Sequence, residues 1–164
     1  FPWNGVGISG GAQRNTIGPV NVIAFNTSHG VLIDGGVTSG HKITQNSIHT
    51  NGLWGIDLAN GANQNILPPT IDGVTIDTNV QIEGSACVGC TVEVFQSPDS
   101  DGEGKSWLGS ATADFGGNFF LEVPSVSQPY LTATATDAVK GTSEFSSVYL
   151  SELLVKLYLP VVMH

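Results

Sequence analysis

Short stretches of alternating apolar and polar residues recur every 25 residues in the first third of the chain. They begin at glycine and cover Gly5–Ile8, Gly30–Ile33 and Gly55–Leu58. A second segment, Asn21–Asn26, recurs 25 residues later as Asn46–Asn51, and a looser match relates 15–17 to 41–43. Alternation of this kind places the apolar side chains on one face of a short strand.

Each unit is too short and too rich in glycine for a helical hairpin. Three short strands per unit, joined by Gly or Asn corners, predict about two and a half coils of a parallel β-helix over residues 1–66. Stacked coils superpose equivalent positions, so Asn26 and Asn51 are expected to form a ladder at a corner. Asn tolerates the left-handed conformation that such corners need. The alternative is a Gly- and Asn-rich β-sandwich without coils.

The pattern changes after Pro68 and Pro69. Alternating runs separated by turn residues follow at 80–83, 91–95, 107–111, 118–123, 130–136 and 143–148. About seven short strands in roughly 80 residues are typical of an immunoglobulin-like β-sandwich. The sequence therefore predicts an all-β chain, with coils over 1–66 and an Ig-like sandwich over 67–150.

The order of these segments carries a family resemblance. Residues 46–58, 91–95, 131–137 and 142–146 resemble the C-terminal end of large bacterial surface proteins, in which right-handed parallel β-helix repeats precede an Ig-like module. The resemblance implies secretion, an extracellular location at the cell surface and a surface role. It brings no catalytic motif.

The last segment, residues 151–164, is the most apolar part of the chain but is too short to span a bilayer. Its alternation predicts a strand, and the residues proposed to take part in assembly are Leu153, Val155, Leu157, Tyr158, Leu159, Val161 and Val162. This tail is either the edge strand of its own sandwich, a strand added to a neighbouring subunit, or a sorting or anchoring tail. The resembling proteins often end in a similar apolar tail containing Tyr-Leu-Pro, which favours retention at the surface.

Composition narrows the function classes. Fourteen acidic and 5 basic residues give a net charge of −9, which argues against binding to nucleic acid. The hydrophobic content of 40% argues against disorder. Because Met163 is the only methionine, we expect the chain to be a processed or excised piece.

Two short segments carry candidate site residues. Cys87 and Cys90 are too few for a closed zinc site, so a small disulfide is expected, with a free or metal-bound pair as the alternative. Asp99, Asp101 and Glu103 present carboxylates at every second position. This spacing fits either a solvated hairpin turn or a calcium site, and no other cofactor is expected.

The remaining chemistry-bearing residues have structural alternatives as well. Asp34 and Asp57 on adjacent coils have the diagonal spacing of an inverting glycosidase pair, or are two solvated acids. Trp54 and Trp107 are candidate contacts to a glycan, or packing residues. The four His residues show no metal-ligand spacing.

The sequence alone therefore favours a non-enzymatic, extracellular structural protein. The end of a coil exposes unpaired main-chain groups, so we expect a homo-oligomer or filament formed by β-edge pairing or head-to-tail stacking, with the tail as one source of a strand. A carbohydrate-binding or adhesive module is the alternative, and a remnant of a polysaccharide-active enzyme is the second alternative.

Overall fold

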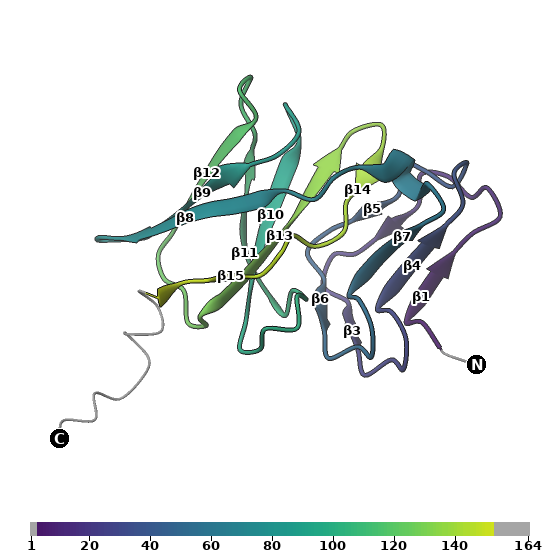
Figure 1. Cartoon of the computed structure of the whole chain (residues 1–164), viewed down its shortest axis with the longest axis horizontal. Helices are drawn as coiled ribbons and strands as arrows, with labels where there is room; N and C mark the ends of the chain where they lie inside the picture. Colours follow the sequence, from purple (N-terminus) through teal and green to yellow (C-terminus); the bar gives the residue numbers. More distant parts are fainter. Residues whose placement is uncertain (1–2, 153–164) are drawn as a thin grey trace.

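The computed structural model describes residues 3–152, which form an all-β chain (Figure 1). The first seven strands make three short parallel sheets. The first contains β1 (Val6–Ile8), β4 (Val31–Asp34) and β7 (Ile56–Ala59), the second β2 (Thr16–Ile17) and β5 (Lys42–Ile43), and the third β3 (Val22–Ala24) and β6 (Ser47–His49). Val6, Val31 and Ile56 are paired in register, so the 25-residue repeat is the spacing between stacked coils.

The apolar residues of each coil point inwards. The buried members of this core are Ile23, Val31, Ile33, Ile43, Ile48, Ile56 and Ala62. The glycine that opens each repeat has a steric reason. A Cβ on Gly5 would lie 2.6 Å from Asn26 Nδ2, and a Cβ on Gly30 would lie 2.9 Å from Asn51 Nδ2. Glycine therefore makes room for the asparagine side chains at the neighbouring corner.

The left-handed backbone conformation at the corners does not fall on the asparagines, where we expected it. The positive φ falls on the residue before each asparagine: Val20 (61°), Phe25 (60°), Gln45 (50°) and Thr50 (56°). Asn21, Asn26, Asn46 and Asn51 themselves do not adopt it. These asparagines serve through their side-chain hydrogen bonds, and the strained conformation is held by the coils stacked around it.

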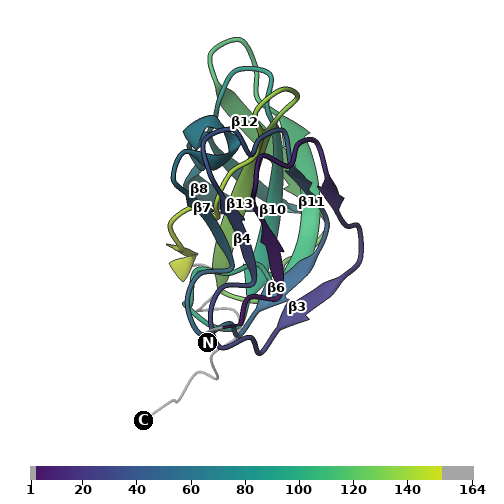
Figure 2. The same ribbon diagram turned by 90° about the vertical axis from the view of Figure 1, so that its right-hand side faces the viewer.

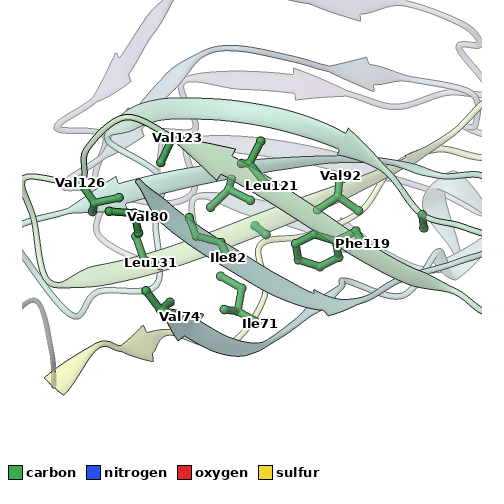
Figure 3. Close-up of a cluster of buried hydrophobic side chains, with 13 residues drawn as sticks. Ile71, Val74, Val80, Ile82, Val92, Phe119, Leu121, Val123, Val126 and Leu131 are labelled. Carbon is green, nitrogen blue, oxygen red and sulfur yellow. The ribbon is translucent and has the colours of Figure 1, made fainter. Parts of the chain in front are cut away.

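The second part of the chain consists of two antiparallel sheets packed face to face. One sheet contains β8 (Thr70–Ile76), β9 (Val80–Ser85) and β12 (Asn118–Val123). The other contains β10 (Thr91–Ser97), β11 (Ser106–Thr112), β13 (Tyr130–Asp137), β14 (Gly141–Thr142) and β15 (Tyr149–Leu150). Figure 3 shows the core between them, where Val92 and Leu131 of one sheet face Ile82 and Phe119 of the other.

Two segments of this part differ from the sequence expectation. Strand β8 begins at Thr70, directly after the proline pair, where we predicted no strand. Residues 143–148, predicted as a strand, are irregular. Ser143 and Ser146 explain the irregularity, because their side chains accept hydrogen bonds from the amides of Ala135 and Ala133 in place of main-chain carbonyls.

Strands β10 and β13 lie in the middle of the molecule, with the outer sheet on one side and the coils on the other (Figures 1 and 2). Alternate residues of β13 therefore serve two interfaces. Ala133 and Ala135 pack into the sandwich core, while Thr132 and Thr134 are buried on the opposite face.

The coils and the sandwich are connected by a segment that contains the short 3-10 helix η1 (Ala62–Asn65). Asn63, Gln64 and Asn65 in this helix have positive φ. Across residues 3–152, the structure holds no helix with the length and apolar character needed to cross a bilayer.

The left-handed corner residues lead to a test of stability. Val20 is 85% exposed and β-branched at a φ of 61°, whereas asparagine tolerates this conformation. We expect Val20→Asn to raise the free energy of unfolding by about 1 kcal/mol in denaturant titrations. Val37→Asn is the matched control, because Val37 is also exposed but lacks a positive φ. An equal effect in both variants would contradict the strain argument.

Candidate functional site

One end of the coil stack is an open rim made by β1, β2 and β3. Each of these strands pairs with the coil below and, within residues 3–152, with no strand above. The rim surrounds a hollow of about 390 Å³, lined by Gly5, Val6, Ile17, Asn21, Val22, Ile23, Ala24 and Asn26. The rim thus combines unpaired strand edges with a hollow lined by both aliphatic and asparagine side chains, and unpaired strand edges are a template for further β structure.

The other end of the stack is closed by the sandwich. Glu93, Glu103 and Glu144 come from β10, the loop before β11 and the segment after β14, and each accepts a main-chain N–H from the coils. The donors are Gln45, Asn51 and Leu58 at distances of 2.8, 3.0 and 3.0 Å. Unpaired N–H groups at the end of the stack are therefore satisfied by carboxylate oxygens, which form stronger hydrogen bonds than neutral acceptors.

Glu103 is the most enclosed of these three acids, with 1% of its surface exposed. Its Oε2 accepts the main-chain N–H of Asn51, and its Oε1 accepts the Asn51 side-chain amide at 2.8 Å. Burial raises the pKa of Glu103 above its usual value, while the two hydrogen bonds from Asn51 oppose that rise.

Main-chain and hydroxyl groups complete the closed end. Thr44 Oγ1 donates to Glu93, and Thr142 Oγ1 accepts the Ile43 amide at 2.9 Å. The Ile48 amide donates to the carbonyl of Gly104, also at 2.9 Å. A Cβ on Gly104 would lie 2.6 Å from the Phe145 ring, so glycine is needed for this close approach. Phe145 is partly buried and packs against the apolar core of the coils.

This closure bears on the expected head-to-tail stacking, which stays a prediction. Head-to-tail stacking of coils requires the lower coil face to be free, but the molecule's own sandwich covers that face. A second copy therefore has no bare lower coil to offer to the rim.

Asparagine ladders connect the coils at two corners. Asn26 donates its main-chain N–H and its Nδ2 to Asn51 Oδ1, at 3.3 and 2.8 Å. Asn21 makes the same two bonds to Asn46 Oδ1, at 3.2 and 3.0 Å. The predicted pair of Asn26 and Asn51 is thus one of two equivalent ladders that share one direction of donation.

His41 occupies a third corner and is fully buried. Its Nδ1 lies 3.2 Å from the main-chain N of Asn15, and its Nε2 lies 3.0 Å from the carbonyl of Ala12. An Nε2–H tautomer satisfies both contacts, so His41 acts as an acceptor in the position where asparagine stands elsewhere. It has a structural role between coils.

The calcium candidates are separated in the structure. Glu103 turns inward to Asn51, while Asp99 and Asp101 stay exposed on the loop. Asp101 Oδ1 accepts the Glu103 amide at 3.2 Å, which is a local turn contact. In the part of the chain that the structure describes, no group of three His, Cys, Asp or Glu residues is arranged to hold a metal ion.

Asp34 and Asp57 lie on adjacent strands with the expected offset, since Asp57 pairs with Leu32 and Asp34 with Ala59. Each has its own partner. Asn60 Nδ2 donates to Asp34 at 2.7 Å, and Asp57 lies 3.5 Å from His29 Nε2. Both carboxylates therefore contact corner residues of the coils, Asn60 and His29.

The two tryptophan candidates lie apart. Trp54 is 62% exposed beside a hollow of about 260 Å³ at the junction of coils and sandwich, lined also by Asp101, Glu144 and Ser147. Trp107 lies on β11 opposite Phe95 and does not line that hollow. Of the two candidates, Trp54 is thus the one that lines this hollow.

Cys87 and Cys90 form a disulfide at the turn before β10. The apolar tail residues Leu153 to Val162 lie outside the described residues. The capping acids Glu93 and Glu144 were missed by the sequence analysis. Glu93 alternates with Val92 and Val94, a pattern that normally indicates a solvent-facing residue, and nothing local shows that a second layer covers that face.

Removal of the Glu103 carboxylate tests the closed end. Glu103→Ala removes the acceptor of the partly buried Asn51 main-chain N–H and one acceptor of its Nδ2 amide, which keeps its contacts to the carbonyls of Ile23 and His49. We therefore expect the free energy of unfolding to fall by about 1 to 2 kcal/mol. Glu83→Ala is the control, because Glu83 is exposed on β9. Equal losses in the two variants would show that Glu103 does not support the junction.

The raised pKa of Glu103 sets a pH dependence. The folded state holds this proton more tightly than the unfolded state, whose pKa is about 4.5. The resulting stability is fully present below that pH and is lost as pH rises through the folded-state pKa. We therefore expect the difference in unfolding free energy between wild type and Glu103→Gln to decline over this window and then level off. A difference that does not change with pH would contradict the assigned environment.

The chain was also compared with known proteins. No protein-family model matches it, and no curated protein sequence is significantly similar.

Proposed function

We propose that this chain is a non-catalytic structural part of an extracellular surface protein, and that it joins further β structure by edge pairing at the open rim. The observation that carries the proposal is the difference between the two ends of the coil stack. One end is closed by three carboxylates, and the other presents strand edges around a hollow lined by both aliphatic and asparagine side chains.

The proposal assigns a short right-handed parallel β-helix to the coils and an Ig-like fold to the sandwich. Parallel pairing with a 25-residue register supports the first assignment, and two antiparallel sheets around one core support the second. The resemblance of the sequence to bacterial surface proteins with β-helix repeats and an Ig-like module also supports both assignments. The disulfide between Cys87 and Cys90 supports an oxidising, extracellular compartment.

A structural role also agrees with how the buried acids are used. Glu93 and Glu103 accept hydrogen bonds from main-chain and amide groups at the junction. Their oxygens are engaged in holding the two parts together, which leaves them poorly suited to proton transfer. Asp34 and Asp57 are likewise bound to corner residues. These contacts support a non-enzymatic role.

A bare edge is expected to associate weakly with other copies of the chain. We therefore expect sedimentation velocity to show a mass that rises with protein concentration. Ile17→Lys places a charge in the hollow of the rim and should abolish this rise. Leu67→Lys is the control, because Leu67 is 79% exposed and does not line the rim. Thermal unfolding of each variant verifies that it is folded.

A wild-type chain that stays monomeric at all concentrations, or an association that Ile17→Lys leaves unchanged, would refute edge pairing at the rim. A chain ending at residue 152 adds a second comparison. If the apolar tail supplies the pairing strand, this truncation should reduce association as much as Ile17→Lys does.

Binding of a glycan is a second candidate function, and the placement of Trp54 favours it. An exposed indole beside carboxylates and a serine can stack on a sugar ring while polar groups bind its hydroxyls. We expect Trp54→Ala to abolish any signal on a glycan array and Trp107→Ala to retain it. Loss of the signal in Trp107→Ala alone would exclude the hollow at the junction.

A further inference from the structure

The asparagine ladders have a direction. Between the paired asparagines the coil nearer the rim donates and the coil nearer the sandwich accepts: Asn21 to Asn46, and Asn26 to Asn51. The Nδ2 groups of Asn46 and Asn51 also donate back to the carbonyls of Ile17 and Ile23. Each step uses the same two donors, the main-chain N–H and the Nδ2 amide, and one Oδ1 acceptor. The end of the stack at the sandwich therefore needs hydrogen-bond acceptors, and the end at the rim needs hydrogen-bond donors.

At the closed end, the donor groups of the last asparagine need an acceptor. Asn51 directs its main-chain N–H and its Nδ2 towards the sandwich, and no further coil follows there. Glu103 receives both groups on its two carboxylate oxygens, at 3.0 and 2.8 Å. A Cβ on Gly55 would lie 3.2 Å from Glu103 Cγ, just as Cβ atoms on Gly5 and Gly30 would meet ladder amides. Glu103 thus occupies the place of the next asparagine in the ladder.

The open rim has the opposite requirement. Asn21 Oδ1 and Asn26 Oδ1 accept no hydrogen bond from any residue in 3–152, and both asparagines line the hollow. These oxygens are the ends of the ladders that need donors. The hollow between them needs apolar side chains, because Val6, Ile17 and Ile23 line it.

A complete coil meets these requirements better than a single strand. One added strand would pair with β1, β2 or β3 and would leave the other two edges and the hollow uncovered. A second copy placed rim to rim would oppose Oδ1 acceptors with Oδ1 acceptors. Self-association at the rim is therefore expected to be the weaker contact.

We propose that the rim binds a parallel β-coil in the same 25-residue register, carrying two asparagines five residues apart. Their main-chain N–H and Nδ2 groups donate to Asn21 Oδ1 and Asn26 Oδ1, and the inward aliphatic side chains of the coil fill the hollow. This inference rests on the proposed function and specifies the partner of the same rim.

The experiment extends the whole chain by one coil. A second copy of residues 5–29 is inserted before Gly5, because its asparagines already donate in the required direction. The control carries the same insertion with the added copies of Asn21 and Asn26 changed to alanine. Hydrogen exchange of the Gly7 amide is the readout. Since Val6 N–H points to the second coil, the next amide along the strand points away from it, to the rim.

We expect the asparagine-bearing coil to protect the Gly7 amide, and the alanine control to protect it about tenfold less. The added coil should also abolish the concentration-dependent association of the original chain. Protection of the Leu131 amide in the sandwich core verifies that each extended chain is folded.

Two results would overturn the inference. Equal protection in both insertions would show that the ladder oxygens do not select the coil, while edge pairing at the rim would stand. No protection in either insertion would show that the rim does not accept a parallel coil. The proposed function would then be tested separately, by whether Ile17→Lys abolishes the concentration-dependent association of the original chain.

Discussion

The structure depends on how the last coil satisfies its main-chain donors. Every strand at the end of a parallel stack leaves N–H groups without a neighbour, and burial of such groups without acceptors is costly. In this chain Glu93, Glu103 and Glu144 supply the acceptors from three separate segments of the sandwich. Beside these acids the Ile48 amide donates to the carbonyl of Gly104, where a side chain would collide with the rings of Phe95 and Phe145.

This closure makes the two parts of the chain mutually dependent. Strand β13 packs its alanines into the sandwich core and buries its threonines on the side facing the coils, so one strand contributes to both interfaces. Thr132 Oγ1 donates to the carbonyl of Glu103, which connects the middle sheet to the capping loop. Separation of the parts would expose buried carboxylates and unpaired N–H groups together, which favours cooperative unfolding.

The asymmetry of the coil stack links this architecture to function. The ladders run in one direction, so the stack has a donor end and an acceptor end. The donor end is covered by carboxylates of the sandwich, and the acceptor end lies around a hollow lined by both aliphatic and asparagine side chains. In the proposed function, directional hydrogen bonding of this kind would discriminate between partners, because a coil presenting donors at the two asparagine corners would satisfy the Oδ1 acceptors of the rim.

The amino-acid sequence by itself determined the all-β class, the 25-residue spacing of the coils and the pairing of Asn26 with Asn51, because stacked coils repeat the same local environment and so repeat the same residue types. The end of the stack has no such repetition. Glu93 and Glu103 look like surface residues of a strand and a loop. Residues 143–148 alternate like a strand, although the amides of Ala133 and Ala135 donate to serine hydroxyls of this segment and not to its main-chain carbonyls. Which acids are buried, which coil face is covered and which rim is left open were decided only by the packing of the sandwich against the coils, since those contacts join residues about 30 to 100 positions apart, and no local pattern records them.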